Sequence, residues 1–163
     1  MNSDLSKIKN IRSKKKFTIS LAESCTGGMI SKYLTSINGS SLFFNGACIS
    51  YSNQMKIRLL KVSKNTIINY GAVSHQTALA MVKGLKKITD SEILLSVTGV
   101  AGPSGGTLRT PVGCVFFGIG SKINKKYTFK TAKKIFHEKT RHAIQKKSTE
   151  YAMYLILKEL KKI

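Results

Sequence analysis

The chain has 163 residues, of which 42% are hydrophobic, and it carries a formal net charge of +21. This length suits one domain with a buried core, and the hydrophobic content together with only two prolines argues against a disordered protein. No apolar run reaches the 18 residues of a membrane-spanning helix, and residues 1–16 lack the apolar middle of a signal peptide, so we expect a cytoplasmic protein. The three widely spaced cysteines indicate free thiols rather than a disulfide framework or a zinc site.

The positive charge comes almost entirely from lysine, with 24 lysines against four arginines. Specific reading of nucleic-acid bases and bidentate gripping of phosphates both favour arginine. The lysines are also spread from Lys7 to Lys162 rather than gathered into one stripe. We therefore favour a coding bias as the origin of the charge, and we expect only non-specific adhesion to nucleic acid.

Apolar periodicity and turn residues predict alternating helices and strands, with no linker, repeat or domain boundary along residues 1–163. This alternation is typical of an α/β sandwich with a mixed sheet. In chain order, we predict a helix over 4–14, a strand over 17–22, a helix over 29–37, a strand over 44–51, a helix from Asn53 as its cap to 60, a helix over 75–88 capped by Ser74, strands over 93–98, 112–119 and 127–131, and a closing helix over 138–161.

Two glycine-bearing loops follow predicted strands, one over residues 23–28 and the other over residues 98–106. Ligands of such sheets bind at the carboxyl ends of the strands, so both loops are candidates for a binding site. Glycines allow backbone N–H groups to turn toward an anion, although a helix cap and a plain connection explain the same residues. Cys25 has no histidine near it in the sequence that could activate it as a nucleophile.

A serine, a tyrosine and a lysine lie close together at Ser41, Tyr51 and Lys56. A serine hydroxyl needs a neighbouring base to become a nucleophile, and a lysine can be that base when burial lowers its pKa. The tyrosine hydroxyl could bridge and orient the other two side chains. The alternative interpretation is that Ser41 caps a turn, Tyr51 packs at a strand end and Lys56 is an ordinary solvated lysine.

Six short motifs resemble, in order, those of the CinA C-terminal domain family, which includes bacterial nicotinamide-nucleotide amidases. The resemblance spans about residues 17–155, the expected core of a single domain over 1–163. The motifs are Ala22-Glu23-Ser24-Cys25-Thr26-Gly27-Gly28, Gly39-Ser40-Ser41, Tyr51-Ser52-Asn53-(x2)-Lys56, Gly71-Ala72-Val73-Ser74, Thr98-Gly99-Val100-Ala101-Gly102-Pro103-(x)-Gly105-Gly106 and Pro111-Val112-Gly113.

The resemblance implies a three-layer α/β/α sandwich and hydrolysis of the carboxamide of nicotinamide mononucleotide to the acid and ammonia. It assigns Ser41 as nucleophile with Tyr51 and Lys56, requires no metal or cofactor, and makes a homodimer the expected assembly. Two positions depart from the family pattern: Thr110 stands where a lysine is usual, and Gln145 where a second arginine is expected. The residues expected to bind the nucleotide substrate are Glu23, Thr26, Gly27, Thr98, Gly99, Gly102 and Arg141.

Two other functions remain open from the sequence. A protein of the same fold could bind the nucleotide without hydrolysing it, and the two departures, which thin the positive lining of a phosphate site, favour that alternative. A basic DNA-associated protein linked to competence is the other, and its binding should then survive about 200 mM salt, whereas adhesion through counterion release should fade.

Overall fold

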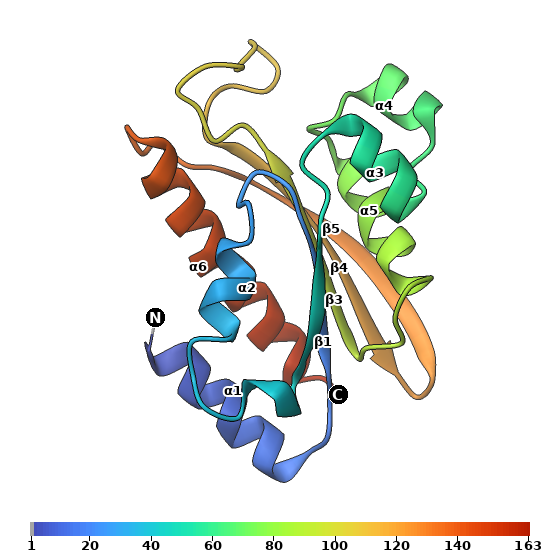
Figure 1. Ribbon diagram of the computed structural model, residues 1–163, viewed down its shortest axis with the longest axis vertical. Helices are drawn as coiled ribbons and strands as arrows, with labels where there is room; N and C mark the ends of the chain where they lie inside the picture. The colour runs from blue at the N-terminus through green and yellow to red at the C-terminus, as the bar shows by residue number, and fades with distance from the viewer. Residues whose placement is uncertain (1) are drawn as a thin grey trace.

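A five-stranded sheet forms the middle of the molecule in the computed structural model, which describes residues 2–163 (Figure 1). The strands lie in the order β2-β1-β3-β4-β5; β1 pairs in parallel with both β2 and β3, whereas β4 and β5 pair antiparallel. The predicted mixed sheet is therefore confirmed. The strands are β1 (Ile19–Glu23), β2 (Phe44–Ile49), β3 (Ile93–Gly99), β4 (Cys114–Ile123) and β5 (Lys126–Ile135).

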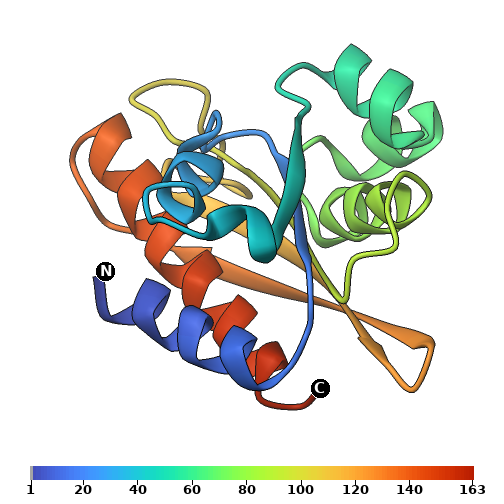
Figure 2. The same cartoon turned by 60° about the horizontal axis from the view of Figure 1, so that its bottom comes forward.

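Helices cover both faces of the sheet and complete the three layers that were expected (Figures 1 and 2). One face carries α1 (Asn2–Lys14), α2 (Met29–Leu34) and α6 (Arg141–Leu160). The other face carries α3 (Asn53–Leu60), α4 (Lys64–Tyr70) and α5 (His75–Lys86).

The central strands are buried on both faces, which explains why their sequences are almost continuously apolar instead of alternating. Toward α1, α2 and α6, side chains such as Leu21 and Val97 join the larger of the core clusters. Toward α3 and α5, Leu94 packs with Leu60 and Met81 in a second cluster. β2 is different, because it lies at the sheet edge and alternates between half-buried and exposed residues.

The parallel pairing places the carboxyl ends of β1, β2 and β3 at the same edge of the sheet. Glu23, the last residue of β1, is paired with Ile49 of β2 and with Val97 of β3. The segments that leave these three strands therefore begin side by side, and the site described below lies among them.

The structure differs from the sequence predictions in one short helix and one hairpin. α4 was not predicted, because it has no buried residue and its polar sequence has no apolar periodicity. The hairpin was expected to turn across 120–126, yet β4 and β5 continue to a tight turn at Asn124 and Lys125, both with positive φ. Gly120 stays in the strand because its missing Cβ, which would lie 2.9 Å from Phe129, leaves room for that ring.

Gly84 controls how closely α5 approaches the end of α3. A Cβ at this position would lie 1.8 Å from the carbonyl oxygen of Leu60, so Gly84→Ala forces the two helices apart. Overpacking of this kind typically costs about 1–3 kcal/mol, which exceeds the roughly 1 kcal/mol that alanine gains over glycine in a helix. We expect a lower melting temperature for Gly84→Ala, measured by circular dichroism. Gln76→Ala, at an exposed position of the same helix, should leave it nearly unchanged.

Candidate functional site

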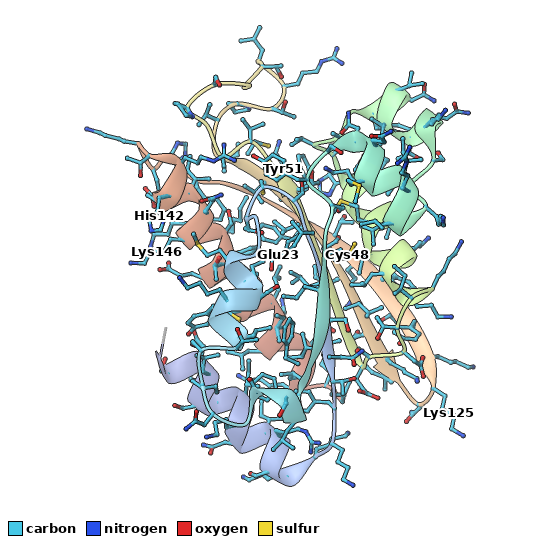
Figure 3. The ribbon with its side chains drawn as sticks, viewed as in Figure 1. Glu23, Cys48, Tyr51, Lys125, His142 and Lys146 are labelled. Atoms are coloured by element: carbon cyan, nitrogen blue, oxygen red, sulfur yellow. The ribbon has the colours of Figure 1, made fainter. Side chains whose placement is uncertain are left out.

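A pocket of about 270 Å³ opens at the edge of the sheet where β1, β2 and β3 end. Figure 3 shows Tyr51 at this end of the molecule and Lys125, in the β4–β5 turn, at the opposite end. The pocket is lined by the loops that follow the three strands, by α3, by the loop between α4 and α5 and by the start of α6. Its lining residues are Ser24, Cys25, Tyr51, Asn53, Lys56, Ala72, Val73, Thr98, Gly99, Val100, Ala101, Gly102, Ser104, Gly105 and Arg141.

Lys56 is the buried cation of this pocket, with only 2% of its surface exposed. It lies in the first turns of α3, whose N-terminus is capped by Ser52 rather than by Asn53 as predicted: the Ser52 hydroxyl accepts from the N–H of Met55 at 3.1 Å. Burial lowers the pKa of Lys56 below its ordinary value, because an ammonium group loses hydration inside the protein. This is the lysine to which the sequence analysis assigned a functional pKa.

The amine of Lys56 lies among three oxygen atoms. Its Nζ is 2.9 Å from the hydroxyl of Ser24 and 3.1 Å from each of the backbone carbonyls of Ser50 and Tyr51. Ser24 directly follows β1, is 6% exposed and lines the pocket. Within residues 2–163, no other side-chain hydroxyl is hydrogen-bonded to this amine. The arrangement places a hydroxyl group within hydrogen-bond distance of a buried amine.

The assignment of Ser41 as nucleophile is wrong, because Ser41 lies at the opposite end of the strands from the pocket, before the first residue of β2. It is exposed in a single 3₁₀ turn (Ser40–Leu42) that precedes β2, whereas Tyr51 and Lys56 follow β2. The six residues of β2 hold the two ends about 17 Å apart. The short distance along the sequence was misleading here, because residues before and after an extended strand lie at opposite ends of the sheet.

Tyr51 belongs to the pocket, but its hydroxyl does not bridge Ser24 and Lys56. Arg141 donates a hydrogen bond from Nη2 to the Tyr51 hydroxyl and another from Nη1 to the carbonyl of Gly102 at 2.9 Å. The Tyr51 side chain is 56% exposed, and its contact with Lys56 is made by the backbone carbonyl. Arg141 thus ties the β2–α3 loop to the glycine-bearing loop after β3.

Glu23, Thr26 and Gly27 do not line the pocket, so the structure gives no support to their assignment as substrate-binding residues. The carboxylate of Glu23 is fully buried and accepts from the Thr26 hydroxyl at 2.6 Å, from the Ser31 N–H at 2.8 Å and from the Ser31 hydroxyl at 2.5 Å. It also accepts from the N–H groups of Gly28 and Ile30. Its role is to hold the turn between β1 and α2 and to satisfy the free donors of that helix.

The remaining expected residues do lie in the pocket. Thr98 is the last residue but one of β3, and its hydroxyl donates to the carbonyl of Ala72 at 2.8 Å. Gly99 packs directly on β4, where a Cβ would lie 2.8 Å from the carbonyl oxygen of Cys114. Gly102 has φ +74° and a Cβ there would meet Val112. That Thr98, Gly99, Gly102 and Arg141 bind a substrate stays a prediction.

Cys25 adjoins Ser24 but is unsuited to act as a nucleophile. Burial raises the pKa of its thiol to about 12, so almost none of it is thiolate at neutral pH. The raised pKa agrees with the expectation from the sequence that Cys25 lacks an activating partner, but the sequence analysis did not single out Ser24 beside it. A usable signal was present, since Ser24 lies two residues after the predicted buried strand over 17–22 and shortly before the glycine pair that precedes the predicted helix over 29–37.

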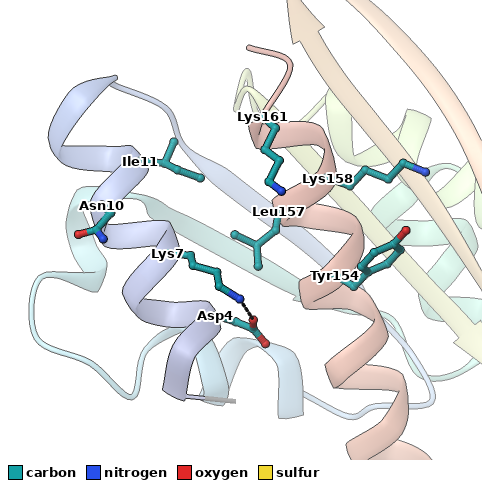
Figure 4. Close-up of a pocket in the computed structure, with 8 residues that line it drawn as sticks. All are labelled: Asp4, Lys7, Asn10, Ile11, Tyr154, Leu157, Lys158 and Lys161. Carbon is teal, nitrogen blue, oxygen red and sulfur yellow. Dashed lines mark hydrogen bonds and ion pairs between the residues drawn. The ribbon is translucent and has the colours of Figure 1, made fainter.

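A larger cavity, of about 720 Å³, lies between α1 and α6 (Figure 4). Its lining combines Ile11 and Leu157 with several lysines, and Lys7 forms an ion pair with Asp4 at 3.4 Å. It contains no hydroxyl–amine pair like that of Ser24 and Lys56. Within residues 2–163, no three histidine, cysteine, aspartate or glutamate side chains are grouped as a metal site would require, and no helix is long and apolar enough to span a membrane.

Replacing the buried carboxylate should show its structural role. Glu23→Gln keeps the size of the side chain but replaces one carboxylate oxygen, which accepts hydrogen bonds, by an NH₂ group, which can only donate them. We expect a loss of at least about 2 kcal/mol in unfolding free energy, since hydrogen bonds to a charged group are strong and the amide leaves buried N–H groups unpaired. Urea unfolding measures the loss. Glu138→Gln, at a position outside this network, is the control, and equal stability of the two variants would contradict the role.

The lowered pKa of Lys56 predicts a pH-dependent stability. The folded protein releases this proton at lower pH than the unfolded chain does, so stability gains from Lys56 as pH rises from the lowered pKa toward 10.5. Lys56→Met has no ionisable group at this position, so its stability does not increase in this way as the pH rises. We therefore expect the melting temperature of the wild type, relative to Lys56→Met, to increase between pH 7 and pH 10. A difference that stays constant or shrinks over that range would show that Lys56 is not desolvated in the folded protein.

Comparison with known proteins agrees with the fold and the motifs. The CinA C-terminal domain model matches residues 3–160. A "CinA-like protein" of Pseudothermotoga lettingae is 42% identical over 89% of this chain and 34% of its own length, and one of Petrotoga mobilis is 47% identical over 89% and 35%. The chain thus spans about a third of the length of these curated relatives.

Solved structures show the same architecture. The competence/damage inducible protein CihA from Agrobacterium tumefaciens superposes with a TM-score of 0.88 at 31% identity, over 95% of this chain and 92% of that one. A CinA superfamily protein from Klebsiella pneumoniae 700603 gives 0.88 at 23% identity, over 99% and 98%, which bears on the fold alone. With nearly its whole length matched, this chain belongs to the CinA C-terminal domain family.

Proposed function

We propose that the protein is an amidohydrolase in which Ser24 is the nucleophile and Lys56 the base. The observation that carries this proposal is the 2.9 Å contact between the Ser24 hydroxyl and a buried amine at the floor of a pocket. As substrate we propose the carboxamide of nicotinamide mononucleotide. The sequence motifs suggest this substrate, and the printed names of the relatives specify none.

The hydrogen bonds around Lys56 suit a neutral amine. A neutral amine has two N–H donors and one lone pair, and the carbonyls of Ser50 and Tyr51 can occupy both donors. In the structure Nζ donates to the Ser24 hydroxyl, which donates in turn to the Tyr51 carbonyl at 3.5 Å. In the neutral amine the lone pair would face the Ser24 hydroxyl, and a rotation of that hydroxyl would make it the donor of the contact. Burial favours this neutral form by lowering the pKa of Lys56. A base in this state is ready to remove the hydroxyl proton.

The reaction would proceed through a covalent intermediate. Ser24 Oγ attacks the carboxamide carbon while its proton passes to Lys56. Collapse of the tetrahedral intermediate breaks the C–N bond, and Lys56 returns the proton to the nitrogen, which leaves as ammonia. Water, deprotonated by the neutral Lys56, then hydrolyses the acyl ester and releases the acid. Backbone N–H groups at the pocket would stabilise the oxyanion.

The surroundings of the pair fit an anionic substrate. Arg141 is the second cation of the pocket lining, and it reaches into the pocket from the start of α6. The adjoining loop contains Gly102 and Gly105, both with positive φ, as is common where backbone N–H groups gather around an anion. The net charge of +21 adds a general attraction for nucleotides.

The assignment predicts opposite outcomes for two serines. With nicotinamide mononucleotide as substrate, ammonia release should fall at least about 1000-fold in Ser24→Ala, because the nucleophile is removed. Ser41→Ala makes the same chemical change at the opposite end of β2, about 17 Å from the end at which the pocket lies, and should leave the rate unchanged. A coupled assay for ammonia measures both.

Each result has a clear meaning. Loss of activity in Ser41→Ala, or full activity in Ser24→Ala, would contradict the pair proposed here. If the wild type binds the mononucleotide tightly but releases no ammonia, the protein is a nucleotide-binding member of the family without turnover, and the amidase proposal fails.

A further inference from the structure

The first turns of α6 are hydrogen-bonded to each of the three pocket loops that follow β1, β2 and β3. Arg141 and Gln145 are four residues apart and so lie on the same face of the helix. Arg141 contacts Tyr51 in the loop after β2 and Gly102 in the loop after β3. Gln145 reaches the remaining loop, after β1, by donating from Nε2 to the carbonyl of Cys25 at 2.9 Å.

The Gln145 contact has a defined direction. A carbonyl oxygen can only accept, so the amide nitrogen of Gln145 must face Cys25. In a trans peptide the N–H points opposite to the C=O, so this bond also fixes the direction of the Thr26 N–H. Among residues 2–163 that N–H has no hydrogen-bond partner of its own. The Gln145 side chain on α6 thus helps to set the orientation of the peptide bond between Cys25 and Thr26.

The turn that carries Ser24 is held from two sides. On one side, the Glu23 carboxylate binds the Thr26 hydroxyl, and the Gly27 N–H donates to the Ser24 carbonyl at 3.0 Å. On the other side, the bond from Gln145 is the one that joins this turn to α6. Without that bond the Cys25 carbonyl loses its partner on α6, and the turn keeps only its local bonds, such as the one from the Met29 N–H to the Thr26 carbonyl at 3.1 Å. The Ser24 hydroxyl is then held less firmly opposite Lys56.

We propose that Gln145 is a positioning residue for the reaction at Ser24, acting through the Cys25 carbonyl and without contacting the substrate. This inference rests on the proposed function. It also gives a purpose to a departure from the family pattern, since glutamine supplies here a neutral donor where an arginine was expected. Binding of the nucleotide does not depend on this contact, whereas alignment of the nucleophile does.

The test compares two replacements of similar size. Gln145→Met removes the donor, and Gln145→Glu places an acceptor against the Cys25 carbonyl. We expect each to lower kcat for ammonia release about tenfold or more with KM nearly unchanged, because a displacement of about 1 Å can cost up to 100-fold in rate. Lys146→Met, at an exposed neighbouring position labelled in Figure 3, is the matched control and should keep full kcat.

A second measurement does not require amidase activity. Cys25 is 5% exposed, so its alkylation by iodoacetamide, located by peptide mass spectrometry, reports opening of the turn. Loss of the Gln145 bond should accelerate alkylation of Cys25 by about two- to tenfold, the equilibrium factor of one net hydrogen bond. Alkylation of Cys114, which is buried elsewhere, should not change.

The outcomes separate this inference from the proposed function. If the wild type releases no ammonia, the amidase proposal fails, and faster alkylation of Cys25 in Gln145→Met would still establish the contact with the turn. If kcat and Cys25 alkylation in both Gln145 variants match those of Lys146→Met, Gln145 does not position the turn. A rise in KM with kcat unchanged would make Gln145 a binding residue and would also overturn the inference.

Discussion

The buried amine of Lys56 is the constraint around which the site is arranged. A desolvated lysine is costly unless it is neutral or surrounded by oxygen atoms, and Lys56 has three of them within 3.1 Å. Two are backbone carbonyls of the segment that leaves β2. If α3 moved away from this segment, the amine would lose these two hydrogen-bond partners or become exposed to solvent. The third is the hydroxyl of Ser24. One of the three oxygen atoms that make burial of the lysine tolerable therefore belongs to the serine that we propose as its nucleophile.

The buried carboxylate of Glu23, the last residue of β1, supports this arrangement. Glu23 has no basic side chain among its hydrogen-bond partners in the described part of the chain, and its carboxylate is satisfied by hydroxyls and by the free N–H groups at the start of α2. These bonds fix where the chain turns after β1, and Ser24 lies in that turn. Close packing at Gly84 performs a similar task for α3, because it sets how far α3, and with it Lys56, lies from α5. The geometry of the pocket thus depends on contacts made by residues that do not line it.

Most of the fold follows from local patterns, and the exceptions have physical reasons. The buried strands and the capped helices were predictable because burial on both faces and capping hydroxyls leave clear signals, as at Ser74, whose hydroxyl accepts from the Thr77 N–H. α4 left none, since a short exposed helix needs no apolar stripe. The end of the hairpin was missed because Gly120 looked like a turn residue, whereas its true function is to make room for an aromatic ring on the next strand.

The site divides along the same line. The sequence by itself indicated the two glycine-bearing loops and the end of the sheet at which they meet, and its family motifs singled out Lys56, which the structure buries. Only the tertiary structure decided which serine faces that lysine. Ser24 and Lys56 are 32 residues apart, but the parallel pairing of β1 with β2 brings both strand ends to one edge. Ser41 is nearer to Lys56 along the chain but lies far from it in space, because β2 separates the two and an extended strand places its ends at opposite ends of the sheet.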